Sequence, residues 1–530
     1  MRSSTAPPPH APREPARPPG RGGVGGRPWA PRPALALFLV ALVAGGVAQA
    51  QPRTAQRSAP RNVVVILSDD HRYDFMGFMP RAPAFLRTPN LDRMAAGGAH
   101  VANAFVTTSL CSPSRASMLT GQYAHNHGVV DNTSPVPPGT RFFPEDLQAA
   151  GYRTAWVGKW HMGEDDDRPR PGFDRWVSFR GQGSYTDPVL NVDGERVEHA
   201  GEYTTDVLTD YALDFLGEQD GAGPFFLELS HKAVHAEFVP APRHAGAYAD
   251  DAIPYPPSMW LTEANYRGKP RWVREQRGSW HGVDFMFHGD LGPGQSGFDA
   301  FYRRYAETLL ALDESVGRVL DYLEESGLAQ NTLVLYLGDN GFLLGEHGLI
   351  DKRNAYEESI RIPMLAWAPG WVPAGSRVEA LVRNIDLAPT VLDLAGAASP
   401  IDMDGASFLP LLTGAPPAGA AAPPGDAGGA GREFLYEYYW EYAFPHTPTT
   451  FALRGDRYKY VMYHGLWDTA ELYDLETDPR EQHNLIAVPA MKPVADAMRA
   501  RLFDRLDADD ALRVPMRRGT WQASERLLYE

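Results

Sequence analysis

Short runs of consecutive apolar residues recur along the chain and predict buried β-strands. The first, at 62–68 (NVVVILS), has an uninterrupted apolar interior, as is typical of a strand covered on both faces in a parallel sheet. Further runs of strand length have the same character, at 154–158, 225–230, 332–337 and 363–367. The pattern therefore predicts a sheet whose strands run mostly parallel.

Helical patterns lie between these strands. Over 299–325, apolar residues spaced by three and four positions form one stripe, which comprises Phe301, Tyr305, Leu309, Leu312, Val316, Val319 and Leu323. Thr88 and Pro89 predict another helix start, with the threonine as N-cap and the proline at the first helical position. Strands that alternate with helices predict the fold class α/β, a sandwich around a mostly parallel sheet.

The pattern changes after residues 414–432, which are rich in alanine, glycine and proline. This segment is too poor in large apolar residues to bury a core, so we predict a flexible loop or linker. Beyond it, the sequence predicts a small antiparallel sheet and a helix, with strands at 434–440, 450–454 and 457–463, followed by Glu471-Leu-Tyr-Asp474 and by the helix near 490–507. We therefore expect a large domain at 51–413 and an α+β subdomain at 433–530.

The first fifty residues differ in composition from the rest. They carry six arginines and one glutamate, then the apolar run ALALFLVALVA at 34–44, then Ala48-Gln49-Ala50. The run is short for a bilayer span, and the small residues after it suit a signal peptidase. We predict a signal peptide at 1–50 and an exported mature protein, periplasmic or extracellular, without stable membrane insertion. An uncleaved N-terminal anchor is the alternative.

The net charge excludes one class of partner. The whole chain carries a formal charge of −16, and removal of residues 1–50, with their six arginines and one glutamate, leaves about −21. A strongly acidic protein repels the phosphate backbone, so we predict that it does not bind nucleic acid. Export also bears on Cys111, the only cysteine, because a lone thiol forms no internal disulfide. Such a thiol pairs with another chain, lies buried or takes part in chemistry.

Oxygen-bearing side chains follow two of the predicted strands directly. Asp69 and Asp70 come after the first strand, and Asp339 and Asn340 follow the strand at 332–337. Since working groups gather at the carboxyl ends of the strands in open α/β sheets, we expect these side chains to converge. Three carboxylates and an amide oxygen suit Ca²⁺ or Mg²⁺, and no Cys/His cluster has the spacing of a zinc site. Each pair alone also fits a turn or an N-cap, but both together favour a metal site.

Cys111 stands in the stretch SLCSPSRASMLTGQ at 109–122. Pro113 suits an early helical position, so we expect the cysteine near a helix N-terminus, where free N–H groups attract anions. Arg115 adds a guanidinium of the kind that binds tetrahedral oxyanions. From these features alone, an inert buried cysteine is as good an interpretation as a reactive one.

The motif Cys111-Ser-Pro-Ser-Arg115, followed by Leu119-Thr-Gly121, resembles the signature of the type I sulfatases. The resemblance covers about 60–490 and is nearest to N-acetylglucosamine-6-sulfatases and bacterial glycan sulfatases. It implies an alkaline-phosphatase-like fold, a catalytic domain at 51–413, and removal of sulfate from a carbohydrate such as a glycosaminoglycan, mucin or algal glycan. It also implies that a formylglycine-generating enzyme converts Cys111 to Cα-formylglycine (3-oxoalanine), the nucleophile of the family.

The same resemblance implies the roles of individual residues. The metal, Ca²⁺ with Mg²⁺ as the alternative, would be held by Asp69, Asp70, Cys111, Asp339 and Asn340. Lys159 and His161 lie in VGKWHMG, which is similar to the family's GKWH element. His235, in SHKAVH, resembles its catalytic histidine, and Lys352 lies in a segment similar to its lysine-bearing loop.

These residues would share the work of catalysis. Arg115, Lys159 and Lys352 would stabilise the charge on the sulfate, and His235, alone or with Lys352, would protonate the leaving sugar oxygen. His161 would take a proton from residue 111 so that sulfate leaves. His231 and His347 are weaker candidates, because each also fits simple packing.

A basic segment and two other functions complete the predictions. Residues 267–277 (RGKPRWVREQR) could guide a sulfated saccharide, with Trp272 or Trp280 stacking on a sugar, or could be a solvated loop. The first alternative function is a phosphodiesterase or phosphonate hydrolase built on the same scaffold. The second is a non-enzymatic, calcium-dependent glycan-binding protein with an intact thiol.

Overall fold

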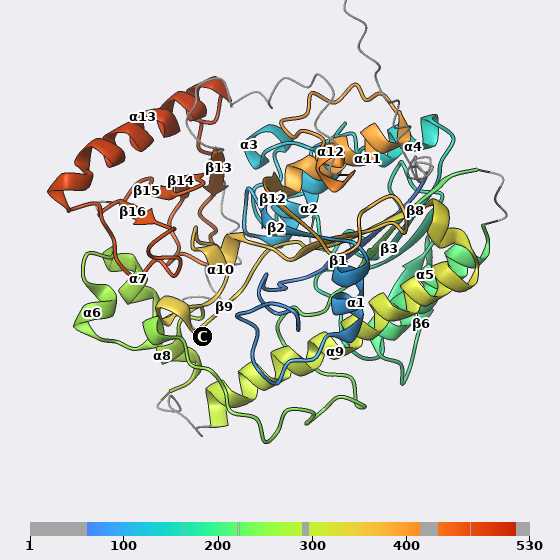
Figure 1. Cartoon of the computed structure of the whole chain (residues 1–530), viewed down its shortest axis with the longest axis horizontal. Helices are drawn as coiled ribbons and strands as arrows, with labels where there is room; N and C mark the ends of the chain where they lie inside the picture. The colour runs from blue at the N-terminus through green and yellow to red at the C-terminus, as the bar shows by residue number, and fades with distance from the viewer. Residues whose placement is uncertain are drawn as a thin grey trace, which may run out of the picture. The chain divides into compact units, whose positions relative to one another are not determined.

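A ten-stranded sheet runs through the computed structural model, which describes residues 61–515 apart from 164, 220, 222, 289–295, 414–432 and 467 (Figure 1). The order of the strands is β12-β2-β11-β8-β1-β7-β3-β4-β5-β6. Their bounds are β1 (Asn62–Ser68), β2 (Ala99–Phe105), β3 (Arg153–Lys159), β4 (Arg175–Phe179), β5 (Val189–Val192), β6 (Glu195–Glu198), β7 (Phe225–Ser230), β8 (Thr332–Gly338), β11 (Met364–Trp367) and β12 (Ser376–Arg383). The predicted signal peptide and the low-complexity segment lie outside the described residues.

The centre of the sheet is parallel, as predicted. β1 lies between β7 and β8 and runs parallel to both, so that Val65 pairs with Glu228 on one side and with Leu335 on the other. β3 and β4 continue this arrangement. β11 runs antiparallel to β8 and β2, and β5 runs antiparallel to β4 and β6. Every strand predicted for the large domain is therefore present, and the one at 363–367 is reversed relative to its neighbours.

Alternate residues of the sheet face two separate cores. On β1, Val64 and Ile66 pack with α1, α5 and α9, whereas Val63, Val65 and Leu67 pack with α2, α4, α11 and α12. Figure 1 shows these two sets of helices on opposite sides of β1, β3 and β8. Their bounds are α1 (Pro89–Gly97), α2 (Cys111–Thr120), α4 (Pro144–Ala149), α5 (Thr204–Gly217), α9 (Ser296–Glu325), α11 (Leu387–Ala395) and α12 (Leu409–Thr413).

The stripe predicted over 299–325 is confirmed by α9. From Tyr305 to Leu323 its members are buried in the first core, and Phe301 packs against that core from a partly exposed position. Because α9 packs on both α1 and α5, it fixes the layer behind the carboxyl ends of β1 and β8.

A second sheet follows residue 432. Its four strands are antiparallel neighbours in chain order, β13 (Glu433–Tyr438), β14 (Thr450–Gly455), β15 (Tyr458–Tyr463) and β16 (Glu471–Asp474). Leu435, Leu453 and Leu472 pack with Met498 and Leu502 of α13 (Lys492–Ala508). The other face of this sheet contributes Phe434, Tyr436, Ala452 and Val461 to the second core of the large sheet. The small antiparallel sheet and its helix were predicted from sequence, and both are confirmed.

Short elements connect the layers. The helices are α3 (Ala124–His127), α6 (Glu263–Tyr266), α7 (Arg271–Gln276), α8 (Val283–Met286) and α10 (Glu357–Ile360). Short 3₁₀ helices occur at Pro257–Met259, Leu328–Asn331, Glu346–Gly348, Asn384–Asp386 and Pro489–Met491, and β9 (Leu343–Leu344) pairs with β10 (Ile350–Asp351). Within the described part of the chain, every helix is too short or too polar to cross a membrane.

Candidate active site

Two adjacent parallel strands bring the predicted metal ligands together. β1 and β8 pair in register up to Ser68 and Gly338, so the residues that follow leave the sheet side by side. Asp69, Asp70, Asp339 and Asn340 are all fully buried there. The Asp70 backbone N–H donates to Asp339 Oδ1 at 3.0 Å, and Asn340 Nδ2 donates to Asp70 Oδ1 at 2.6 Å.

The donor atoms of this cluster fit a hard divalent cation. Asp69, Asp70 and Asp339 each offer a carboxylate oxygen within 4.8 Å of the others. Asp70 Oδ2 and Asn340 Oδ1 are buried without a hydrogen-bond donor. A buried acceptor that lacks a partner costs about 1–3 kcal/mol, which a bound cation would offset. Oxygen ligands of this kind suit Ca²⁺ or Mg²⁺.

Burial would by itself raise the pKa of both Asp69 and Asp70, but their surroundings separate them. Lys159, with smaller contributions from His235 and Arg115, holds the pKa of Asp69 well below its usual value. Burial raises the pKa of Asp70 to about 7, against the opposing effect of Lys352. Asp69 is therefore an anion at neutral pH, and a bound cation would favour the ionised form of Asp70 as well.

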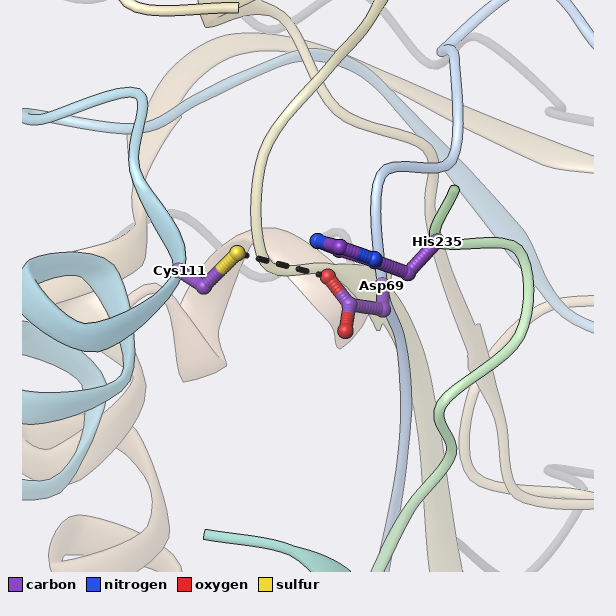
Figure 2. Close-up of side chains that lie close together, drawn as sticks. All are labelled: Asp69, Cys111 and His235. Atoms are coloured by element: carbon purple, nitrogen blue, oxygen red, sulfur yellow. Dashed lines mark hydrogen bonds between the residues drawn. The ribbon is translucent and has the colours of Figure 1, made fainter. Parts of the chain in front are cut away.

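Cys111 is the first residue of α2 and lies against this cluster. Its Sγ is 3.5 Å from Asp69 Oδ1 and 3.3 Å from Lys352 Nζ. Figure 2 shows the thiol and the imidazole of His235 near Asp69. Burial, and next the negative charge of Asp69, raise the pKa of the thiol. The side chain is thus a neutral thiol at neutral pH and a poor nucleophile in itself.

Arg115 lies four residues further along α2 and connects three strand ends. Its Nε donates to Asp339 Oδ2 at 3.0 Å, and Nη2 lies 2.9 Å from the same oxygen. Its Nη1 donates to the Lys159 carbonyl at 2.8 Å and to Ser230 Oγ at 2.5 Å. The guanidinium therefore orders the carboxylate cluster directly. Its predicted contact with sulfate stays a prediction.

Lys159 and Lys352 are buried rather than ordinary surface lysines. Lys159 ends β3 and forms an ion pair with Asp69, and Lys352 follows β10 and forms an ion pair with Asp70. Although burial alone would lower it, the charge of Asp70 raises the pKa of Lys352 well above its usual value. Lys352 is therefore positively charged, and the ammonium groups of both lysines contact carboxylates of the cluster that contains Cys111.

His161 and His235 reach the cluster from different loops. Ser112 Oγ, next to Cys111, donates to the His161 carbonyl, and His235 Nε2 lies 3.8 Å from Asp70 Oδ2. Burial, and next the charge of Lys159, lower the pKa of both imidazoles well below the usual value. Both rings are consequently neutral at neutral pH, so each holds one proton on one of its two nitrogens.

The structure separates the weaker candidates from this cluster. His231 lies in the core, with Nε2 3.0 Å from Ser315 Oγ of α9, and His347 stacks on Tyr356 at 4.0 Å between ring centroids. Trp272 is buried against Tyr463, so the expectation that it stacks on a sugar at the surface is wrong. Trp280 is 64% exposed.

Sequence reasoning missed three residues that border the site. Ser230 ends β7 and accepts a hydrogen bond from Arg115. It could have been predicted, because functional side chains gather at the carboxyl ends of parallel strands. Lys232 lies in the segment SHKAVH, in which the family resemblance points only to the histidines. Tyr185, whose hydroxyl donates to the His235 carbonyl at 2.6 Å, is 50 positions away in sequence and gave no signal.

Comparison with known proteins agrees with the geometry. The family model described as Sulfatase matches residues 61–397, and one described as N-sulphoglucosamine sulphohydrolase, C-terminal, matches residues 345–508. The N-acetylglucosamine-6-O-sulfatase of Bacteroides thetaiotaomicron is 33% identical over 505 residues, which cover 85% of this chain and 86% of that protein.

Two further matches extend the comparison. A solved structure of a protein in complex with its substrate D-glucosamine-2-N,6-O-disulfate has a TM-score of 0.76 and 30% identity, and the match covers 86% of this chain and 99% of that one. The multifunctional alkaline phosphatase superfamily protein PehA of Trinickia caryophylli is 30% identical over 493 residues, 81% of this chain and 92% of that protein. On these matches, the chain belongs to the sulfatase family, whose members are sulfuric ester hydrolases.

Proposed function

We propose that the protein removes sulfate from a sulfated carbohydrate and that its first candidate substrate is a 6-O-sulfated glucosamine unit. One observation carries the proposal. Cys111 begins a buried helix, 3.5 Å from Asp69 and 3.3 Å from Lys352, in a chain of the sulfatase family. The sugar is inferred from the names of similar proteins, one an N-acetylglucosamine-6-O-sulfatase and one in complex with a glucosamine disulfate.

We propose Cα-formylglycine at position 111 because the thiol itself is a poor nucleophile there. When hydrated, that aldehyde supplies one hydroxyl as the nucleophile toward sulfur and a second hydroxyl whose deprotonation releases sulfate. A divalent cation, Ca²⁺ before Mg²⁺, supplies positive charge to the anionic ester when it is bound by Asp69, Asp70, Asp339 and Asn340. The buried, unpaired oxygens of Asp70 and Asn340 support this assignment.

The side chains around residue 111 would then divide the proton transfers. His235 holds a proton for the leaving sugar oxygen, as the neutral ring beside Asp70 allows. His161, held next to Ser112, takes a proton from residue 111. Lys159 and Lys352 keep positive charge at the site throughout, because each stays paired with a carboxylate.

Maturation and export belong to the same proposal. A formylglycine-generating enzyme would modify Cys111, and a signal peptide at 1–50 would direct the protein to the periplasm or the exterior, where Ca²⁺ is available. The charge pattern and apolar run of residues 1–50 support export. The large domain at 51–413 would carry the catalytic residues, and the subdomain at 433–530 would complete it.

The decisive experiment combines mass spectrometry with turnover. Protein produced together with a formylglycine-generating enzyme should carry an aldehyde at position 111 and hydrolyse N-acetylglucosamine-6-sulfate. The Cys111→Ala variant should lose about 10⁴-fold or more of kcat/KM, since the nucleophile is absent. Chelation should abolish turnover, and Ca²⁺ or Mg²⁺ should restore it. Full activity in the alanine variant would overturn the proposal.

The same preparation tests the two alternatives. The multifunctional alkaline phosphatase superfamily protein among the similar chains is a reason to include phosphodiesters and phosphonate esters in the assay. A kcat/KM higher for those esters than for any sulfate ester would favour the phosphodiesterase or phosphonate hydrolase. An intact thiol, calcium-dependent glycan binding and no turnover would favour the binding protein.

A further inference from the structure

A fourth cationic side chain, Lys232, lies beside the site without a role so far. It follows β7 and its side chain is 6% exposed, yet among the described residues its ammonium group has no hydrogen-bond acceptor and no carboxylate within ion-pair distance. Lysine is almost never buried to this extent unless it is paired, because an isolated buried charge is costly. An ammonium with so little contact with solvent and no acidic partner within ion-pair distance is therefore a candidate for binding an anion.

Tyr185 and the turn that carries His235 fix the position of Lys232. The Lys232 ammonium lies over the Tyr185 ring, 4.8 Å from its centroid. The Tyr185 hydroxyl donates to the His235 carbonyl at 2.6 Å, and the His235 backbone N–H donates to the Lys232 carbonyl at 2.9 Å. One phenol thus supports both the ammonium and the candidate proton donor, and a cation over an aromatic face is stabilised where no carboxylate is available.

The charged groups around Lys232 show that it lies next to the candidate active site. Burial, and next the charge of Lys159, lower the pKa of Lys232 to about 8, while Asp69, Asp70 and Glu237 act in the opposite direction. The group is therefore close to Lys159 and still mostly positive at neutral pH. It also acts on His235, whose pKa it helps to lower. Lys159, Asp69, Asp70 and His235 belong to the candidate active site, and Glu237 follows His235 by two positions.

The other cations of the site differ from Lys232 in one respect. Lys159 is paired with Asp69, Lys352 with Asp70 and Arg115 with Asp339. Among the described cations of the site, Lys232 is the one that no carboxylate contacts within ion-pair distance, although Asp69, Asp70 and Glu237 are near enough to act on its pKa. Its charge acts on Asp69, Asp70 and His235, so an anion that pairs with it would bind next to the candidate active site.

We propose that Lys232 binds the sulfate group that is removed, and that Tyr185 is the residue that positions it. The ligand class is a sulfate monoester or, after the reaction, inorganic sulfate. This inference rests on the proposed sulfatase function and adds to it an anion-binding residue to which the resemblance found from sequence assigns no role. A charge-assisted contact to a sulfate oxygen would speed the binding of inorganic sulfate and slow its dissociation.

The test measures binding of inorganic sulfate directly. Calcium-loaded wild-type protein and the Lys232→Met and Lys232→Arg variants are titrated with sodium sulfate in a calorimeter, and the inhibition constant of sulfate is measured with the matured enzymes. Lys232→Met should weaken sulfate binding by about 10- to 100-fold in both measurements, as expected for a hydrogen bond to a charged group. Lys232→Arg should stay within a few-fold of wild type, because the charge is retained.

Two further variants separate this role from simple packing. Lys269 is a matched control, since it is also buried over tyrosine rings but is hydrogen-bonded to Tyr473 Oη and the Glu481 carbonyl. Lys269→Met should leave sulfate affinity unchanged. Tyr185→Leu, which removes the ring, should weaken sulfate binding, whereas Tyr185→Phe, which keeps the ring, should weaken it less. This second pair keeps the test valid if Lys232→Met does not fold.

The outcomes distinguish the inference from the function on which it rests. If wild type hydrolyses sulfate esters and Lys232→Met binds sulfate like wild type, the inference is wrong and the sulfatase function stands. If Lys232→Met alters KM only for disulfated sugars, Lys232 binds a second acidic group, and the inference is also wrong. If matured wild type hydrolyses no sulfate ester, the proposed function itself fails.

Discussion

At the scale of residues, the charges around position 111 are arranged in opposite pairs. Arg115, Lys159 and Lys352 each contact one of the three carboxylates that end β1 and β8. Buried ions are stable only when they are paired in this way, and the pairs also fix the direction of each side chain. A divalent cation bound by the carboxylates would leave the site with excess positive charge, which attracts an anionic ester.

Arg115→Lys tests the importance of this geometry. Lysine retains the positive charge but cannot contact Asp339, the Lys159 carbonyl and Ser230 together, as the guanidinium does. We expect kcat/KM for a sulfate ester to fall by about 10²-fold, because displacement of the carboxylates misplaces the catalytic groups. Steady-state kinetics of the matured variant measures this loss.

The control for Arg115→Lys is Arg377→Lys, because Arg377 pairs with Glu379 at an exposed position. That variant should change kcat/KM by less than about two-fold, as expected for a surface ion pair. Equal kinetics for wild type and Arg115→Lys would show that charge alone suffices at position 115.

The burial of Cys111 predicts when the proposed modification to formylglycine would take place. Its side chain is fully inaccessible in the folded protein and lies beneath Lys352 and Asp69. A formylglycine-generating enzyme should therefore convert an unfolded peptide that spans 105–125, but not folded protein purified with an intact thiol. Mass spectrometry of both reactions checks this prediction. Conversion of the folded protein at the same rate as the peptide would contradict it.

Sequence alone predicted the residues of this site better than their partners. Asp69, Asp70, Asp339 and Asn340 could be predicted because parallel strands end at one edge of the sheet. The ion-pair partners could not be predicted, because residues such as Asp70 and Lys352 are 282 positions apart in sequence. Lys232 could not be identified either, because its burial without an acidic partner is seen only in the folded structure. Burial and pairing depend on tertiary contacts, which no local pattern encodes.

At the scale of elements, the start of α1 shows how tertiary contacts replace a predicted cap. Thr88 occupies the N-cap position, as predicted, but its side chain does not cap the helix. Its hydroxyl accepts from the Gly77 N–H at 2.7 Å and donates to Asp92 Oδ1 at 3.0 Å. The carboxylate of Asp313, on α9, accepts instead from the backbone N–H groups of Asn90 and Leu91, at 3.1 and 2.8 Å.

Asp313→Ala should therefore destabilise the protein through α1. We expect the free energy of unfolding to fall by about 1–2 kcal/mol, the usual cost of a lost N-cap. Burial raises the pKa of Asp313 to about 6, so the folded protein binds a proton there that the unfolded chain releases above about pH 4. Wild-type stability from this group is thus greatest at low pH and declines as the pH rises from about 4 to 6.

The deficit of Asp313→Ala should accordingly be larger at pH 4.5 than at pH 7.5, in denaturant unfolding curves followed by circular dichroism. Asp321→Ala is the matched control on the same helix, because Asp321 forms an exposed ion pair with Arg93. It should change stability by less than about 1 kcal/mol. A deficit of the same size in both variants would show that Asp313 does not cap α1.

Two of the strands that sequence missed, β12 and β6, form the edges of the large sheet. β12 has the sequence SRVEALVR and alternates buried with exposed positions, and β6 (ERVE) is mostly exposed. Charged residues weaken the apolar signal of such strands, although they suit strands that border solvent. Central strands such as β1 and β8, which are fully buried, were predicted almost to the residue.

At the scale of the whole molecule, the C-terminal sheet supports the loop that carries Lys352. Arg353, the next residue, donates from Nε to Glu441 Oε1 at 2.7 Å, and Tyr438 Oη on β13 donates to the same oxygen at 2.8 Å. Glu357, at the start of α10, accepts from Arg454 Nη2 at 3.1 Å and pairs with Lys459 at 3.1 Å. The sequence predicted two domains with a linker between them, and these buried ion pairs join the parts on either side of that linker.

The Glu441→Gln variant tests whether the position of Lys352 depends on the C-terminal sheet. The glutamine keeps the shape of the side chain but leaves the Arg353 guanidinium with less compensating charge, and loss of one partner from a buried ion pair costs about 3–5 kcal/mol. Because Arg353 adjoins Lys352, we expect a lower kcat for a sulfate ester as well as a lower midpoint of thermal unfolding. Glu433→Gln, at the half-exposed pair with Arg501 on the same sheet, is the control and should leave kcat unchanged. If Glu441→Gln lowered stability but left kcat at the wild-type value, the sheet would support the fold without positioning Lys352 for catalysis.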